Sequence, residues 1–105
     1  MPEKVVIYAR VNNPSQTHDE QIDACKKFAL ENDFEIEQIY LDSYSGNSKI
    51  LVERFNEILK DMNNLGVNVL LTKESSRISR NDLIRFEIEG KFKEYNKLII
   101  PVQSK

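Results

Sequence analysis

Apolar residues recur along the chain with two alternating spacings, which predict four strands and three helices. Short runs rich in β-branched residues predict strands over residues 5–9, 34–41, 67–72 and 98–102. Apolar residues at helical spacing predict helices over residues 18–32, over 51–62 with an end before Gly66, and from Asn81 or Asp82 to about Tyr95. Strands therefore alternate with helices along almost the whole chain.

The order of these elements predicts an α/β fold with three layers. Residues 67–72 are apolar nearly throughout, which is typical of a central parallel strand buried on both faces. Residues 34–39 alternate between apolar and polar, which favours an edge strand with one solvated face. Strands separated by helices form βαβ units with right-handed crossovers. We therefore expect a mainly parallel sheet of about four strands with helices on both faces.

Length and composition predict one small domain and give no sign of a membrane or metal protein. The 105 residues, 40% of them hydrophobic, are enough for a single core. No apolar stretch is long enough for a signal peptide or a membrane span, and the single cysteine, Cys25, fits the apolar stripe of the first helix as a buried, reduced thiol. His18 is the only histidine, so a metal site or a histidine-based triad has no support. We expect a cytoplasmic protein without a bound metal.

The charge of the chain restricts any nucleic-acid binding to a local site. The 15 basic and 17 acidic residues nearly cancel, so the chain lacks the broad positive charge of a free-standing nucleic-acid binder. Three arginines nevertheless follow two predicted strands: Arg10 follows residues 5–9, and Arg77 and Arg80 follow residues 67–72. Ligands of open parallel sheets bind beyond the carboxyl ends of the strands. If the two strands are neighbours, the three guanidinium groups converge on one crevice.

Such a crevice is chemically suited to a phosphate. Arginine holds phosphate oxygens bidentately and stabilises the charge that develops when a phosphoryl group is attacked. Arg77 and Arg80 are three residues apart and would face the same way on a helical turn. Polar side chains of the first loop would form the opposite wall, namely Asn12, Ser15, Gln16 and Gln21. The alternative is that Arg77 and Arg80 are solvated helix-start residues paired with nearby acids.

Three short motifs occur in a fixed order relative to the predicted strands. They are Tyr8-Ala9-Arg10-Val11 with Gln16 and Gln21 beyond it, Ser45-Gly46 after the second strand, and Arg77-Ile78-Ser79-Arg80-Asn81 after the third. Together they resemble the catalytic domain of the serine recombinases, the resolvase and invertase family. The resemblance implies a serine that attacks a DNA phosphodiester, forms a covalent 5′-phosphoserine link and frees a 3′-hydroxyl. It also implies strand exchange within a tetramer, without a metal or nucleotide cofactor.

The same resemblance implies a role for each site residue. Arg10, Arg77 and Arg80 match phosphate-binding and charge-stabilising arginines, Gln16 and Gln21 match polar active-site positions, and Ser45 matches a serine that lines the site. Asn12 falls on the nucleophile, and its carboxamide nitrogen has no nucleophilic lone pair, so it cannot form the phosphoserine bond. Ser15 is an alternative nucleophile, but a small misplacement of the attacking atom costs on the order of 100-fold in rate. An ordinary turn serine is therefore the favoured interpretation of Ser15.

The sequence departs from the family pattern at further points. Ser76 stands where the family has an acidic residue before the first arginine of its second motif. The family also has an arginine just ahead of the second helix, and the sequence does not decide whether Lys49 or Arg54 corresponds to it. The family's long dimerisation helix and helix-turn-helix module are absent before Lys105, so we expect a single catalytic-like domain over residues 1–105 with weak DNA binding of its own.

Three hypotheses of function remain open at this point. The first is a serine recombinase catalytic domain that binds DNA phosphates but is inactive for cleavage, because Asn12 is either an engineered change or a natural lesion in an otherwise competent protein. The second is a naturally inactive recombinase-like domain that regulates active relatives, as a homo-oligomer or in association with another recombinase. The third is an unrelated phosphate-binding α/β module, which the lack of a glycine-rich phosphate loop makes the weakest of the three.

Overall fold

A computed structural model of the chain describes residues 2–44 and 47–103 and contains four strands and three α-helices. The strands are β1 (Glu3–Val11), β2 (Phe34–Ser43), β3 (Val69–Thr72) and β4 (Leu98–Pro101). The α-helices are α1 (Asp19–Glu31), α2 (Ser48–Leu65) and α3 (Asp82–Glu94), and a short 3₁₀ helix, η1 (Ser75–Arg77), follows β3. The predicted number and order of strands and α-helices are confirmed.

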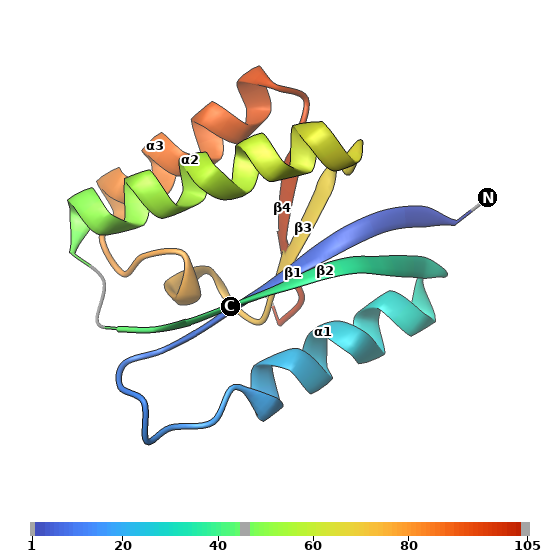
Figure 1. Cartoon of the computed structure of the whole chain (residues 1–105), viewed down its shortest axis with the longest axis horizontal. Helices are drawn as coiled ribbons and strands as arrows, with labels where there is room; N and C mark the ends of the chain where they lie inside the picture. The colour runs from blue at the N-terminus through green and yellow to red at the C-terminus, as the bar shows by residue number, and fades with distance from the viewer. Residues whose placement is uncertain (1, 45–46, 104–105) are drawn as a thin grey trace.

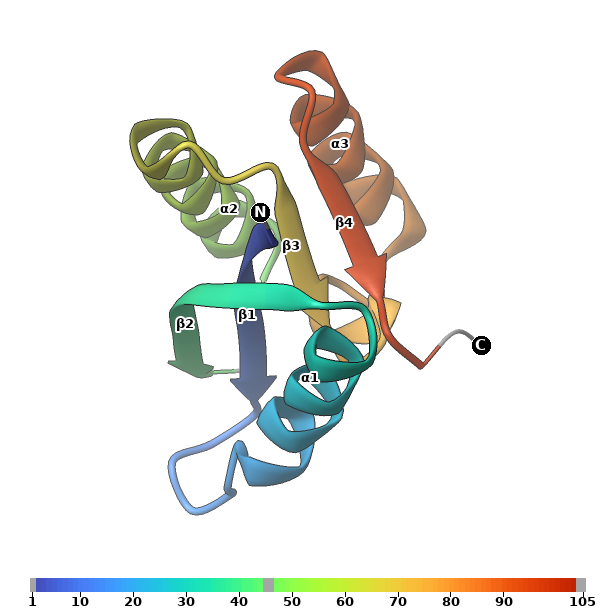
Figure 2. The ribbon, with the colours of Figure 1, turned by 90° about the vertical axis from the view of Figure 1, so that its right-hand side faces the viewer.

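The four strands form one parallel sheet in the order β2-β1-β3-β4. Helix α1 covers one face of this sheet, and α2 and α3 lie side by side over the other (Figures 1 and 2). The predicted three-layer α/β fold is therefore confirmed. The first and third strands are also paired directly with each other. The predicted convergence of the arginines depends on this pairing.

Alternate residues of β1 pack into two separate hydrophobic cores, because successive side chains of a strand point to opposite faces of the sheet. Val6 and Tyr8 face α2 and α3, where the core contains the buried side chains of Phe55, Ile58 and Phe92. The opposite face packs against α1 and consists of Val5, Ile7, Cys25, Ala29, Val69 and Leu71. Cys25 is fully buried there, as predicted. Burial on both faces accounts for the continuous apolar character of the central strands.

The connections leave β1 and β3 towards opposite faces of the sheet. The chain leaves β1 to form α1 on one face, and it leaves β3 to form η1 and then α3 on the other (Figure 2). Since β1 and β3 are hydrogen-bonded neighbours, their carboxyl ends border the point where the two connections diverge. In open parallel sheets this is the place where a ligand can reach the strand ends. The strand connections thus indicate the same ligand site as the positions of the arginines in the sequence, namely the carboxyl ends of β1 and β3.

The observed elements differ from the predicted ones in detail, at several boundaries and in the exposure of two leucines. Strand β2 continues through Asp42 and Ser43, beyond the predicted end at residue 41, because both residues pair with the end of β1. Leu30 and Leu83 are apolar residues of the predicted helices 18–32 and 81–95, but they are 83% and 77% exposed. Each lies one position away from a stripe that repeats every fourth residue, so the helix turns it towards solvent.

Both ends of α2 and the start of α3 are defined by side chains or backbone of the expected kind. Asn81 caps α3, because its Oδ1 accepts hydrogen bonds from the backbone N–H groups of Leu83 and Ile84 at 2.9 and 3.3 Å. Asn47 caps α2 in the same way, accepting from Ile50 N–H at 3.0 Å. Gly66 ends α2 in the left-handed conformation with φ of 71°. In the described part of the chain, no helix is both long enough and apolar enough to cross a membrane.

Two glycines provide a matched test of this backbone geometry. Replacing Gly66 by alanine should lower the free energy of unfolding by about 1 kcal/mol, because its positive φ disfavours a Cβ. Replacing Gly90 by alanine should raise the free energy of unfolding by about 0.5–1 kcal/mol, because that residue lies inside α3 with open space around it. Urea denaturation of both variants measures the two effects. A change of the same sign in both would contradict this account of the end of α2.

Candidate functional site

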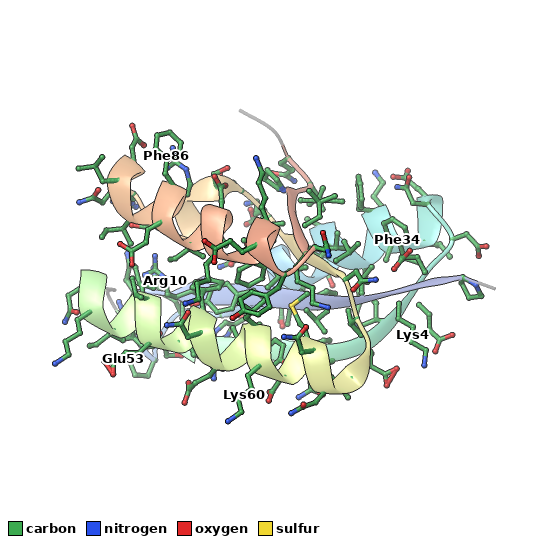
Figure 3. All side chains as sticks on the ribbon, turned by 90° about the horizontal axis from the view of Figure 1, so that it is seen from above. Lys4, Arg10, Phe34, Glu53, Lys60 and Phe86 are labelled. Carbon is green, nitrogen blue, oxygen red and sulfur yellow. The ribbon has the colours of Figure 1, made fainter. Side chains whose placement is uncertain are left out.

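Arg10 lies at the carboxyl end of β1 and is almost completely buried, with 7% of its surface exposed. Its guanidinium group donates hydrogen bonds to three backbone carbonyls: those of Arg77 at 3.3 Å, Ser76 at 3.4 Å and Tyr44 at 3.1 Å. It therefore joins the end of β1 to η1 and to the segment after β2. It lies at the end of the molecule where α2 and α3 begin (Figure 3). Because carbonyls carry no net charge, the positive charge of Arg10 is fixed in place but not neutralised.

Gln21 holds the backbone of Arg10 from the side of α1. Its Oε1 accepts from Arg10 N–H at 3.0 Å, and its Nε2 donates to the Arg10 carbonyl at 2.8 Å. The β1–β3 ladder ends at the pair Tyr8 and Thr72, so the carboxamide replaces a strand partner that is missing beyond that pair. Gln21 is 5% exposed. The predicted site residue therefore holds the backbone of Arg10 in place.

Arg77 lies beside Arg10, as the neighbouring strands predicted. Its Nη1 donates to the Arg10 carbonyl at 3.4 Å, and its Nη2 lies 3.3 Å from Glu74 Oε1. Its Nε is buried and has no hydrogen-bond partner among the described residues. A buried donor without a partner is costly, and the described residues supply none for this nitrogen.

Arg80 does not lie in the same helical turn as Arg77. Helix η1 ends at Arg77, and the intervening Ile78 and Ser79 are buried while Arg80 is exposed. The expectation that Arg77 and Arg80 share one face of a helical turn is therefore wrong. Within residues 2–44 and 47–103, the guanidinium group of Arg80 has no hydrogen bond and no ion pair. Among the described residues, hydrogen bonds thus join Arg10 to Arg77, and none joins Arg80 to either of them.

The loop after β1 contains the remaining predicted residues that the structure describes. Asn12 is exposed, and its backbone N–H donates to Gln16 Oε1 at 2.9 Å. Ser15 donates from both its N–H and its hydroxyl to the side chain of Asn13, which is typical of a turn serine. Ser45 lies outside the described residues. Asn12 and Gln16 are thus joined in one loop beside the end of β1.

Asp42 is a central residue of this region that the sequence interpretation missed. Its Oδ2 accepts hydrogen bonds from the hydroxyls of Tyr8 at 2.8 Å and Tyr44 at 3.1 Å, and from Arg54 Nε at 3.0 Å. Its backbone carbonyl lies 2.8 Å from His18 Nε2. The carboxylate is 9% exposed and joins β1, β2 and α2 behind Arg10. An acid at the end of a strand, next to a strand that ends in arginine, was the sequence signal available for it.

The same contacts distinguish the two basic residues near the start of α2. Arg54 is partly buried and forms the ion pair with Asp42, whereas Lys49 is exposed. Burial, followed by the charge of Asp42, raises the pKa of Tyr8 far above its usual value, and the same two causes raise the pKa of Tyr44. Both hydroxyls therefore remain donors to Asp42 at any physiological pH. This cluster fixes the position of the Tyr44 carbonyl that accepts from Arg10.

A small polar cavity of about 120 Å³ opens between α1 and the end of β3. It is lined by Val11, Gln16, Thr17, Glu20, Gln21, Lys73 and Arg77. Ligand pockets for organic molecules are commonly about 300–1,000 Å³, so this one suits a small polar group. No cluster of three or more histidine, cysteine, aspartate or glutamate side chains suited to a metal occurs in the part of the chain that the structure describes.

Comparisons with known proteins agree with this geometry. A family model described as the resolvase N-terminal domain matches residues 5–103. The chain is similar to the C-terminal catalytic domain of ISC1926 TnpA, an IS607-like serine recombinase, at 25% identity over 97% of this chain and 72% of the other, with a TM-score of 0.78. It is also similar to the N-terminal catalytic domain of TP901-1 integrase, at 25% identity over 95% of this chain and 77% of the other, with a TM-score of 0.77.

A further similarity is to a resolvase family site-specific recombinase from Streptococcus pneumoniae. The identity is 28% over 96% of this chain and 72% of the other, with a TM-score of 0.78. The search of curated protein sequences gives no significant match. The fold of serine recombinase catalytic domains is therefore shared over nearly the whole length of this chain.

The Asp42 cluster can be tested by removing its charge. Replacing Asp42 by asparagine should lower the free energy of unfolding by about 2 kcal/mol, because three donors lose a buried charged acceptor. Asp61 is the matched control, since it is exposed and accepts from one hydroxyl, that of Tyr40 at 3.2 Å. Its replacement by asparagine should cost about 0.5 kcal/mol or less. Equal decreases in the free energy of unfolding, measured by urea denaturation, would show that the Asp42 cluster stabilises the fold no more than an exposed acid does.

Proposed function

The chain belongs to the family of resolvase N-terminal domains and is a resolvase-like catalytic domain of the serine recombinases, and from this premise we propose that it holds a DNA phosphodiester without cutting it. In this proposal Arg10, Arg77 and Arg80 contact phosphate oxygens, and Gln16, Gln21 and Ser45 are the polar residues of the site. The observation that carries it is the meeting of Arg10 and Arg77 at the ends of neighbouring strands.

The electrostatics of the crevice support phosphate binding. The hydrogen bonds of Arg10 go to carbonyls, and Arg77 has one acidic partner at 3.3 Å, so positive charge remains at the ends of β1 and β3. The chain as a whole has a formal charge of -2. Attraction of DNA therefore depends on this local site, and it should weaken steeply with salt.

Position 12 decides whether bound DNA can be cut. A serine there would attack the phosphorus through its hydroxyl oxygen, lose its proton, and release a 3′-hydroxyl as the old P–O bond breaks. The carboxamide of Asn12 offers neither a nucleophilic nitrogen nor a hydroxyl. Its exposure at the start of the loop, joined to Gln16, supports the assignment of this position to the reacting face of the site.

A regulatory role is the second candidate function. Domains of this family act on DNA and form oligomers, and a subunit with asparagine at position 12 would contribute a binding site but no attacking atom to a mixed assembly. The exposed apolar side chains of Leu83 and Phe86 on α3 support contact with another subunit, since they are 77% and 61% exposed. The family match contradicts the third hypothesis of an unrelated phosphate-binding module.

DNA and another recombinase subunit, either identical or related, are the partners in this proposal. The place of action in this proposal is the cytoplasm. Cys25, the one cysteine of the chain, is buried in the core. Burial raises the pKa of this thiol to about 12, so it remains protonated and unreactive in the folded chain.

Phosphate binding can be measured with a 20-base-pair duplex at low salt by fluorescence anisotropy. Replacing Arg77 by glutamine should weaken binding by about tenfold, because a charged contact to phosphate is lost. Arg85 is the matched control, since it also has an acid three residues away and donates to a carbonyl, that of Ser79. Its replacement by glutamine should change the affinity less than about twofold. Equal losses in the two variants would exclude the crevice as the binding site.

Cleavage can be tested at position 12 with the domain joined to a DNA-binding module of known target. Replacing Asn12 by serine should produce a covalent protein–DNA adduct that survives denaturing electrophoresis, whereas the original chain should give none. Replacing Asn13 by serine is the control, because it makes the same chemical change one residue away. An Asn12→Ser protein that binds DNA through Arg77 but forms no adduct would favour the regulatory function.

A further inference from the structure

The small cavity beside Arg10 is lined by a basic residue in addition to Arg77, namely Lys73. Lys73 does not belong to any of the motifs that resemble the serine recombinases. Lys73 is the first residue after β3, and its side chain is 13% exposed. Its ammonium group forms an ion pair with Glu20 in the first turn of α1, and the Glu20 side chain is 80% exposed. Hydrogen bonding to Lys73 and then its charge lower the pKa of Glu20, so the pair is fully charged at neutral pH.

The two partners of this ion pair differ in their freedom to move. Lys73 is held by its surroundings, because its side chain is mostly buried and its backbone carbonyl accepts from Gln103 N–H at 2.8 Å. Glu20 lies on the surface of α1 and can turn into water without losing buried contacts. An exposed carboxylate loses little when it leaves such a pair, because water solvates it again. The cation is therefore the fixed partner and the acid the displaceable one.

Lys73 and Arg77 line the same cavity and follow the same strand. The contacts that the Arg77 guanidinium group makes through its two Nη atoms are long, at 3.3 Å to Glu74 and 3.4 Å to the Arg10 carbonyl. A phosphate oxygen entering the cavity would meet both cations. Gln16, which binds the backbone of Asn12, lines the cavity too, so a group bound there lies next to position 12.

We propose that Lys73 is a second phosphate-binding residue of the site and that Glu20 occupies its ammonium group until a DNA phosphate displaces the carboxylate. One negative charge replaces another at Lys73, so the cation is never left unpaired. This inference rests on the proposed function, since the ligand is the same DNA backbone. Glu20 thereby acts as an internal competitor that lowers the affinity of the free domain for DNA.

The opposing explanation is that the ion pair only fastens α1 to the end of β3. In that case removing Glu20 would leave DNA affinity unchanged or lower it, because the loop before α1 would be held less well. If Glu20 competes with phosphate, its removal raises affinity. A gain larger than that from the same change in net charge elsewhere on α1, and lost when Lys73 is also replaced, therefore separates competition from fastening, and such a gain cannot arise from unfolding.

The test uses the whole chain and a 20-base-pair duplex, with affinity measured by anisotropy at several salt concentrations. Replacing Glu20 by glutamine should raise affinity by about two- to fivefold at low salt, as expected for loss of an exposed ion pair. Replacing Glu31, an exposed acid at the far end of α1, by glutamine makes the same change in net charge and serves as the control. Its effect on affinity should be smaller than about twofold.

Lys73 is tested in parallel. Replacing it by glutamine should lower affinity and reduce the slope of log affinity against log salt by about one, because one phosphate contact is lost. Lys27, exposed on α1, is the control for this change in charge. The double variant Glu20→Gln with Lys73→Gln should bind like Lys73→Gln alone, since without the ammonium group the acid has nothing to occupy.

The outcomes separate this inference from the proposed function. Binding that depends on Arg77 but responds equally to Glu20→Gln and Glu31→Gln would overturn the role of Glu20 and leave the proposed function intact. Additive effects in the double variant would overturn the competition between Glu20 and phosphate in the same way. Absence of any binding that depends on Arg77 would overturn both proposals together.

Discussion

Strand β1 runs past the end of β3, and the backbone left without a strand partner there has to be hydrogen-bonded by side chains. Gln21 supplies both partners for the N–H and carbonyl of Arg10, and Arg77 adds a second donor to that carbonyl. The Arg10 side chain in turn bonds to carbonyls of the segments after β2 and β3. One overhanging strand end therefore brings α1, η1 and the segment after β2 together, and the crevice exists because that backbone must be satisfied.

The cations of this region divide into two kinds by what they contact. Arg10 has carbonyl partners and is buried, so it serves the architecture while keeping its charge. Arg77 and Lys73 each face a single acid and line the cavity. Behind them, Asp42 fixes the Tyr44 carbonyl through a hydrogen bond to the Tyr44 hydroxyl and an ion pair with Arg54. The domain, whose net charge is slightly negative, thus combines one buried cation with fixed contacts and two cavity-lining cations whose acidic partners can be exchanged for a ligand.

The sequence predicted the layers, the strands and the proximity of Arg10 and Arg77, because periodicity determines the elements and parallel strands align their carboxyl ends. It did not predict Asp42, because the last two residues of β2 are polar and belong to the strand only through pairing with β1. The path of the chain from Arg77 to Arg80 has no periodic signal, so the shared helical face expected for them was wrong. The contact between Glu20 and Lys73 joins residues distant in sequence and depends on how α1 packs.

The pairing of β1 with β3 also has a consequence for how the domain folds. Strands β1 and β2 with α1 form a local unit, whereas β3 follows α2 in the sequence and pairs with β1 across a long segment of chain, so this ladder costs more loop-closure entropy. Arg77 and Lys73 both follow β3. A partly folded chain that contains only the first βαβ unit would hold Arg10 and none of the cavity's cations. The crevice is therefore complete only when β3 has paired with β1, and a ligand that binds there would stabilise the fully paired sheet.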